Sequence, residues 1–185
     1  MALKKWEKLS EEVLSTNPYS EYRMAKYRIL PGQEHNFYYI HAGGGSMTVG
    51  VNAEGKIPMV LQYRPNVERE TLEFPAGRRE EGKNEMETAL AELAEETQFA
   101  ARHIEPAGTF DVSPGLTDYV AHVFVAYDLY SCPTAPDATE DIEVQWFTPE
   151  EIDQMIDEKT FLSGWSLAAW SLTRKRILEI IAEQK

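Results

Sequence analysis

The amino-acid sequence predicts an α+β fold, built as an α/β/α sandwich. Two observations carry this prediction. Segments with strand character precede and follow a central helix, and further helices end the chain, an order typical of layered domains. The length of 185 residues, of which 43% are hydrophobic, suits one compact domain that can bury a core.

The N-terminal half is predicted to be mostly extended, because short apolar runs alternate with turn-forming residues. One turn is expected at Pro31-Gly32, and another over residues 52–55, around which the flanking strands are expected to form a hairpin. A short helix is expected over residues 8–15. The expected strands of this half cover residues 23–30, 36–41, 46–51, 57–63 and 71–74.

A central helix is predicted over residues 84–98. Asn84 is a favourable N-cap, and Glu87 three residues later completes a capping-box pair. Another helix is predicted to start at Thr148, because Pro149 follows as its first helical residue. A C-terminal helix is expected after it. The strands expected between the central helix and Thr148 cover residues 109–112, 119–130 and 142–147.

Composition excludes several classes of partner. The formal net charge is −13, so neither nucleic acid nor a membrane surface is expected as a partner, because both attract an excess of basic groups. Cys132 is the only cysteine, which excludes an internal disulfide and a thiolate metal cluster. The first residues lack the apolar core of a signal peptide, and we expect a cytoplasmic protein.

The negative charge is concentrated in two blocks. Residues 68–96 contain ten acidic and four basic residues, and residues 137–158 contain nine acidic residues and no Lys or Arg. Such blocks form solvated faces in most proteins. Carboxylates also bind hard cations such as Mg²⁺, which prefer oxygen ligands, so the spacing must separate the two interpretations.

Three glutamates of the predicted central helix have the spacing of a shared face. Glu92 and Glu96 are four residues apart, and Glu95 lies three residues after Glu92. Like charges so placed repel one another, and a cation relieves that repulsion. The loop from Pro75 to Gly82 precedes the helix, and its glycines let the backbone approach a ligand closely. Alone, this pattern is common on surface helices.

Gly77 and the run Glu92-Leu93-Ala94-Glu95-Glu96 resemble the Nudix box, Gly-x5-Glu-x7-Arg-Glu-U-x-Glu-Glu-x-Gly-U, where U is aliphatic. Three positions depart from it: Lys83 replaces the first Glu, Ala91 the Arg, and Gln98 the Gly. The resemblance implies a degenerate box that keeps its metal ligands and has lost residues that brace the loop. Candidates to replace that brace are Arg78, Arg79, Glu80 and Glu81.

Flanking segments resemble the ADP-ribose and nucleoside diphosphate sugar pyrophosphatase branch of the Nudix hydrolases. They are Gln62-Tyr63-Arg64, Leu72-Glu73-Phe74-Pro75-Ala76-Gly77, Ser113-Pro114-Gly115-Leu116-Thr117-Asp118 and Glu140-Asp141-Ile142-Glu143-Val144. The resemblance covers nearly the whole chain. It implies a Nudix hydrolase domain over residues 46–185, and an N-terminal β extension over residues 1–45 that forms a homodimer and part of the nucleotide site.

The resemblance also implies catalytic and metal-binding roles. The Ala76 carbonyl, Glu92 and Glu96 would hold Mg²⁺ or its substitute Mn²⁺, with Glu95 as a further ligand or catalytic helper. Glu140, on the acidic loop, would be the general base that activates water; alternatively, it is a solvated loop residue. The implied reaction is the hydrolysis of ADP-ribose or a related nucleoside diphosphate sugar to a nucleoside monophosphate and a sugar phosphate.

Substrate contacts are implied for another set of residues. Arg64 would bind phosphate or ribose, unless it pairs with Glu73 or Glu70. Glu73 would hold the base or the sugar. Gly115 and Leu116 would contact the terminal ribose or sugar. Tyr19 would stack on the base or serve as a core or dimer contact. A different class of function stays open: a Nudix-fold sensor that binds a nucleotide sugar and has lost catalysis.

Overall fold

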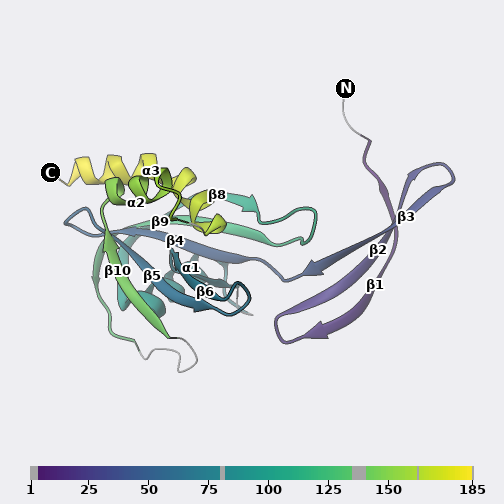
Figure 1. Ribbon diagram of the computed structural model, residues 1–185, viewed down its shortest axis with the longest axis horizontal. Coiled ribbons are helices and arrows are strands. Elements are labelled where there is room, and N and C mark those ends of the chain that lie inside the picture. The colour runs from purple at the N-terminus through teal and green to yellow at the C-terminus, as the bar shows by residue number, and fades with distance from the viewer. Residues whose placement is uncertain (1–3, 80–81, 135–140, 162, 185) are drawn as a thin grey trace. The chain divides into compact units, whose positions relative to one another are not determined.

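A computed structural model describes residues 4–79, 82–134, 141–161 and 163–184. Contacts divide the chain into a first unit, Met1–Gly44 with Asp111–Val120, and a second unit, Gly45–Phe110 with Ala121–Lys185 (Figure 1). The predicted domain boundary places residues 111–120 in the second domain, whereas these contacts group them with the first unit.

The first unit contains a three-stranded antiparallel sheet. Its strands β1 (Glu7–Asn17), β2 (Ser20–Leu30) and β3 (Gln33–His41) pair in chain order. The helix predicted over residues 8–15 is wrong, because these residues pair with β2 along β1. Ladder bonds outweigh a local helix preference of a few tenths of a kcal/mol per residue. The turn at Pro31-Gly32 is confirmed, and Gly32 has the positive φ of 78° that favours glycine.

The second unit contains two further sheets, with strand orders β10-β5-β6 and β7-β4-β9-β8. β4 pairs parallel with β9 and antiparallel with β7, and every residue of β4 is buried. The strands of these two sheets are β4 (Gly45–Val51), β5 (Ile57–Arg64), β6 (Arg69–Glu73), β7 (Ala76–Arg78), β8 (Phe99–Asp111), β9 (Val120–Ser131) and β10 (Ile142–Phe147).

The hairpin predicted from residues 46–51 and 57–63 is only half right. The turn forms, and the Asn52 N–H donates to the Lys56 carbonyl at 2.9 Å. Beyond the turn, β4 and β5 enter different sheets. β4 is buried along its whole length and β5 over its first four residues, and each is an inner strand with its own partners rather than one arm of a two-stranded ladder.

In its described residues, the second unit also contains three helices: α1 (Glu85–Thr97), α2 (Pro149–Asp157) and α3 (Gly164–Glu183). Both predicted helix starts are confirmed, because Asn84 and Thr148 each form a capping box with the glutamate three residues later. α2 and α3 lie side by side (Figure 1), and the Trp170 indole donates to Asp153 at 2.9 Å. α1 and α3 both contact β4.

An aromatic cluster lies in the core of the second unit. Phe74, fully buried, stacks on Trp170 with ring centroids 6.1 Å apart and meets Phe161 edge-on at 6.3 Å. Because Phe74 directly precedes Pro75 and Ala76, this cluster fixes the chain where it enters the predicted cation-binding loop. Among the residues described, no helix has the length and apolar character needed to cross a membrane.

Candidate active site

The loop between β6 and α1 is held by hydrogen bonds from three different elements. The Phe74 N–H donates to Ser166 Oγ of α3 at 3.1 Å, and the Pro75 carbonyl accepts from the Thr48 N–H of β4 at 2.9 Å. The Ala76 N–H donates to Glu96 Oε2 of α1 at 2.9 Å. Buried backbone groups need such partners, so the bonds fix the path of the Ala76 backbone.

Hydroxyl groups of β4 set the position of α1. Ser46 Oγ donates to the Glu85 carbonyl at 2.7 Å, and Thr48 Oγ1 donates to the Ala89 carbonyl at 3.0 Å. Both hydroxyl residues are almost fully buried, with 2% and 0% of their surface exposed. These bonds hold one face of α1 against β4, which determines where the glutamates later in the helix are presented.

Two of the three predicted carboxylates lie against the loop. Glu96 is 8% exposed and bonds the Ala76 amide. Glu92 occupies the space beside Gly77, since a Cβ built on Gly77 would lie 1.8 Å from Glu92 Oε1. Glu95, by contrast, is exposed on the same helix. The structure thus brings Glu92, Glu96 and the Ala76–Gly77 backbone together and leaves Glu95 at the surface.

The donor set at this loop fits a hard cation. Carboxylate and backbone carbonyl oxygens are the ligands that Mg²⁺ and Mn²⁺ take. The Glu92 carboxylate fills the space that a side chain at position 77 would occupy. In the part of the chain that is described, no group of three or more His, Cys, Asp or Glu side chains is already gathered for a metal ion. The arrangement around Gly77 is therefore two carboxylates of α1 that lie against the loop backbone.

An ion pair connects the two ends of the loop that carries Lys83. Arg79 Nη1 donates to Glu85 Oε1 at 2.9 Å, linking the end of β7 to the first residue of α1. The pKa of Glu85 lies below its usual value, first because its carboxylate accepts its own backbone N–H and also because of Arg79. Arg79 is one of the residues expected to replace the brace lost with Lys83 and Ala91, and its ion pair with Glu85 spans this loop.

Gln98, which stands where the motif has glycine, ends α1 in the left-handed conformation with φ 64°. This explains the glycine of the motif, since other residues adopt that conformation at a cost. The Gln98 amide bonds Thr134 twice: Nε2 donates to Thr134 Oγ1 at 3.0 Å, and the Thr134 N–H donates to Oε1 at 2.8 Å. The side chain thus joins the end of α1 to the segment after β9.

Arg64 and Glu73 pair with one another on the β5–β6 hairpin. Nε and Nη2 of Arg64 donate to the two Glu73 oxygens at 3.0 and 2.7 Å, and Thr71 Oγ1 donates to Oε1 at 2.6 Å. Burial raises the pKa of Glu73, but these hydrogen bonds outweigh it, and the pKa lies below its usual value. The acidic neighbour that the sequence offered as an alternative partner for Arg64 is therefore its partner here.

The Ser113–Asp118 loop is bonded to β3 within the first unit. The Ile40 N–H donates to the Leu116 carbonyl at 2.9 Å, and Thr117 Oγ1 donates to the Ile40 carbonyl at 2.7 Å. His41 Nδ1 lies 2.6 Å from Asp118 Oδ2. The loop that contains Gly115 and Leu116 is thus attached to the end of β3, with Leu116 54% exposed.

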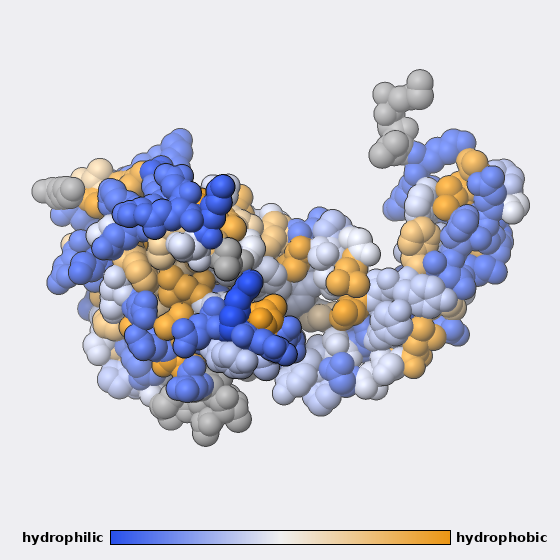
Figure 2. Space-filling model, in the orientation of Figure 1, coloured by the Kyte–Doolittle hydropathy of each residue, from blue (hydrophilic) through white to orange (hydrophobic). Residues whose placement is uncertain are grey.

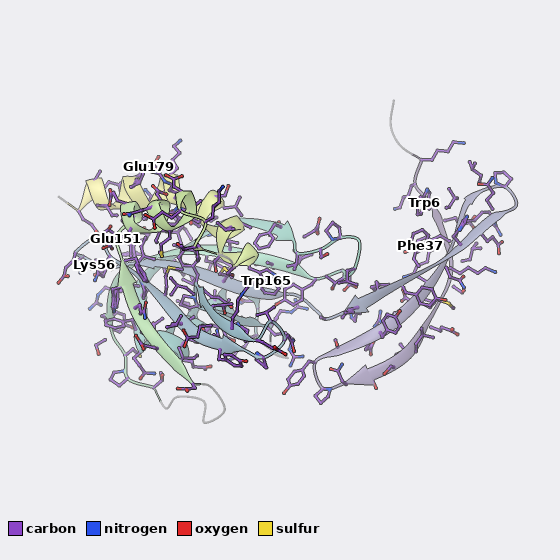
Figure 3. The ribbon with its side chains drawn as sticks, viewed as in Figure 1. Trp6, Phe37, Lys56, Glu151, Trp165 and Glu179 are labelled. Atoms are coloured by element: carbon purple, nitrogen blue, oxygen red, sulfur yellow. The ribbon has the colours of Figure 1, made fainter. Side chains whose placement is uncertain are left out.

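A groove of about 920 Å³ lies in the first unit. Gly115 and Pro114 line it together with aromatic and lysine side chains. Among these, the Trp6 and Phe37 rings lie 5.1 Å apart (Figure 3). Tyr19 lies instead in the turn between β1 and β2 and is 71% exposed. The other aromatic and basic residues along the groove are Lys4, Lys5, Lys8, Tyr27, Tyr38 and Tyr39.

Glu140, the predicted general base, lies outside the described residues. Three residues that hold the loop and α1 were not predicted from the sequence: Ser46, Thr48 and Ser166. For the first two a signal exists, because hydroxyl side chains interrupt the otherwise apolar run of β4. Ser166 is 92 positions from its partner Phe74, and no local sequence pattern predicts that contact.

Comparisons with known proteins show what this chain resembles. The family model of the NUDIX domain matches residues 45–165. An ADP-ribose pyrophosphatase of Bacillus subtilis (strain 168) is 33% identical over 144 residues, 77% of each chain. A methanol dehydrogenase activator of Bacillus methanolicus is 33% identical over 166 residues, 86% of this chain and 90% of that protein.

A solved structure of an ADP compounds hydrolase resembles this chain in fold. It superposes with a TM-score of 0.83 over 97% of each chain, at 18% sequence identity. The predicted α+β fold is thereby confirmed.

Proposed function

The chain belongs to the Nudix hydrolase family, and from that premise we propose that it hydrolyses the pyrophosphate bond of ADP-ribose or a related nucleoside diphosphate sugar. The products would be a nucleoside monophosphate and a sugar phosphate. The observation that carries the proposal is the contact of Glu92 and Glu96 with the Ala76–Gly77 backbone. Both carboxylates of α1 that the motif assigns to metal binding are thus kept, and both lie against that loop.

We propose that Glu92, Glu96 and the Ala76 carbonyl hold a divalent cation, Mg²⁺ or Mn²⁺, with Glu95 as a further ligand or helper. A cation bound there supplies charge neutralisation of the diphosphate and Lewis acidity. A bound cation is needed because the acidic block that contains these glutamates would otherwise repel an anionic substrate. Glu140 is proposed, from the sequence, to take the proton of the attacking water.

Arg64 and Glu73 are proposed to bind the substrate as a pair. The guanidinium donates to both Glu73 oxygens, which fixes its orientation on the hairpin. A planar guanidinium suits a phosphate or ribose oxygen, because its N–H donors match the geometry of such acceptors. Lowering of the Glu73 pKa keeps this carboxylate ionised, so that it can accept hydrogen bonds from ribose or sugar hydroxyls.

The groove of the first unit is proposed to bind part of a nucleotide. Trp6 and Phe37 offer aromatic surface for stacking on a base, and Lys4 and Lys5 offer positive charge to phosphate. Lys8 pairs with Glu11, and Asp111 and Asp118 also line the groove. Gly115 lines the groove, which supports its proposed role near the sugar. Leu116 lies next to it in the chain, and Tyr19 stays a proposed stacking residue from the sequence alone.

The decisive experiment compares Glu96→Gln with wild type on a set of nucleoside diphosphate sugars. Loss of cation stabilisation is worth several kcal/mol, so kcat/KM is expected to fall about 100-fold or more. Wild-type activity should disappear with a chelator and return with added Mg²⁺ or Mn²⁺. Glu140→Gln should lower kcat and leave cation affinity unchanged.

Glu179→Gln is the matched control, because this exposed glutamate of α3 (Figure 3) makes ion pairs within its own helix. Its kcat/KM should equal that of wild type. Tight ADP-ribose binding in calorimetry without any turnover, at every cation tested, would contradict hydrolysis and favour the sensor instead.

A further inference from the structure

A buried hydroxyl near the start of α3 contacts the loop on which the proposed cation site is built. Ser166 is 0% exposed and accepts the Phe74 N–H at 3.1 Å. It lies in the first turn of the helix, next to Trp165, which Figure 3 labels. None of the roles proposed above for substrate or cation involves α3.

The Phe74 amide depends on this partner. β6 ends at Glu73, so its ladder with β5 does not extend to Phe74, whose side chain is fully buried. A buried N–H without an acceptor is costly. Pro75 follows and has no N–H, so between Glu73 and Ala76 the Phe74 amide is the one backbone donor.

The Phe74 amide, which Ser166 holds, lies two residues before Ala76 and its carbonyl in the chain. Proline fixes the φ angle of the intervening residue, which limits the freedom of the link between them. The Pro75 carbonyl is held by Thr48 and the Ala76 amide by Glu96. Of the three partners, Ser166 belongs to the element that is most distant in the sequence.

The Ser166 hydroxyl is itself oriented by the helix cap. Ser163, the N-cap of α3, accepts the Ser166 N–H at 3.4 Å, and its hydroxyl donates to Ser166 Oγ at 3.2 Å. Two serines in one helical turn thus connect the N-terminus of α3 to the Phe74 amide by hydrogen bonds. A larger or apolar side chain at position 166 could not provide an acceptor in the same space.

We infer that Ser166 is a positioning residue of the cation site, which sets the direction of the Ala76 carbonyl by holding the Phe74 amide. This inference rests on the proposed function and assigns part of the catalytic geometry to α3. Residues behind metal ligands commonly change metal affinity by about 10–100-fold when they are removed. The same effect is expected from Ser166.

The test compares Ser166→Ala with Thr173→Ala. Thr173 is a matched control, because it is also fully buried in α3 and its hydroxyl donates only within the helix, to the Ala169 carbonyl at 2.8 Å. Mn²⁺ affinity without substrate is measured by electron paramagnetic resonance of the free ion. Amide hydrogen exchange at Phe74 is measured by NMR, with Val49 of β4 as an internal reference.

Ser166→Ala is expected to weaken Mn²⁺ binding about 10-fold and to speed exchange at Phe74 but not at Val49. Ser163→Ala, which keeps the Ser166 hydroxyl, should give a smaller change in the same direction. Thr173→Ala should leave the Phe74 exchange and the Mn²⁺ affinity as in wild type. These readouts need no turnover, so they report on the loop itself.

Equal Mn²⁺ affinity in wild type and Ser166→Ala would overturn the positioning role while leaving the proposed hydrolysis intact. An equal loss in Thr173→Ala would overturn it too, because the effect would then be a general weakening of α3. A wild-type protein that binds no divalent cation at all would overturn both this inference and the proposed function.

Discussion

At Gly77 the missing side chain leaves the space that the Glu92 carboxylate occupies. A Cβ at this position would lie 1.8 Å from Oε1 and 2.0 Å from Cδ of Glu92, far inside van der Waals contact. Either the helix side chain or the loop must move to accept it. Because φ at Gly77 is not in the left-handed region, the requirement for glycine here is space and not backbone conformation.

Gly77→Ala is therefore expected to weaken divalent cation binding by at least about 10-fold, because it displaces a proposed ligand. Isothermal titration with Mn²⁺ measures this. Gly164→Ala is the control, since a Cβ there meets nothing within 4 Å and the residue starts α3. Unchanged binding in Gly77→Ala would show that Glu92 is not a ligand.

At the residue scale, the sequence allowed the prediction of what is periodic or local. Glu92 and Glu96 share a helix face by spacing alone, and their contacts with the loop agree with that prediction. The same spacing could not tell that Glu95 is exposed, because Glu95 lies three residues after Glu92 but only one before Glu96, and adjacent helix residues are turned by about 100° from one another. Ser166 could not be predicted, because its partner is distant in sequence.

At the scale of elements, α1 and α2 begin with the same device. Asn84 accepts the Glu87 N–H at 2.9 Å, and Thr148 accepts the Glu151 N–H at 3.2 Å. Each glutamate in turn accepts the amide of its N-cap residue. Of these two helices, only α1 carries proposed cation ligands. Loss of either cap should reduce stability, and only loss of the α1 cap should also affect cation binding.

Asn84→Ala and Thr148→Ala are both expected to reduce the free energy of unfolding by about 1 kcal/mol. Urea denaturation measures this loss. Only Asn84→Ala is expected to reduce cation affinity as well, because fraying of α1 begins at the end nearest the loop. Equal cation affinity in the two variants would show that the N-cap of α1 does not affect the cation site.

The β5–β6 hairpin should respond to acid through Glu73. The folded-state pKa of Glu73 is lowered from 4.5, so its contribution to stability is fully present above that value. The contribution is lost as the pH falls through the lower folded-state pKa. Acid thus removes the negative charge of Glu73, which pairs with Arg64 and accepts the hydrogen bond of the Thr71 hydroxyl.

Urea midpoints measured between about pH 3 and pH 7 test this response. The difference in stability between wild type and Glu73→Gln is expected to shrink below pH 4.5. Glu70→Gln, an exposed neighbour on the same hairpin, serves as the control and should follow the wild-type curve. A constant gap between wild type and Glu73→Gln across this range would contradict the pKa shift.

Elements with strong local signals were predicted well, and those that depend on partners were not. α1 and α2 begin where their caps are. β8 runs from Phe99 to Asp111, whereas the sequence suggested a strand only from residue 109, because Arg102, His103 and Glu105 obscure the alternation. Residues 8–15 extend as β1 because β2 lies beside them, which a single segment cannot reveal.

At the scale of the whole molecule, the sheet β1-β2-β3 has exposed aromatic residues. Tyr22 and Tyr38 stack with ring centroids 6.1 Å apart and are 44% and 49% exposed. Hydrophobic side chains stand among hydrophilic ones on this unit (Figure 2). Hydrophobic side chains that gather on an exposed surface are typical of a protein–protein contact. We therefore propose that a second copy of the chain covers this face.

Sedimentation velocity of the wild type is expected to show a dimer, and Tyr22→Glu combined with Tyr38→Glu is expected to shift it to monomer. Two buried charges in an apolar contact cost more than a small interface recovers. Val67→Glu places a charge on an exposed apolar position of the second unit and should leave the dimer intact. A monomeric wild type would rule the proposal out.

The hydroxyls of Ser46 and Thr48 also restrict how the chain can change in length. They bond the Glu85 and Ala89 carbonyls, which fixes α1 in both rotation and translation on β4. One residue inserted between Ala89 and Glu92 would turn the later carboxylates by about 100° around the helix axis and remove Glu92 and Glu96 from the loop. The segment joining Arg79 to Asn84 lies before these bonds, so one residue inserted there would leave the register of Glu92 and Glu96 on β4 unchanged.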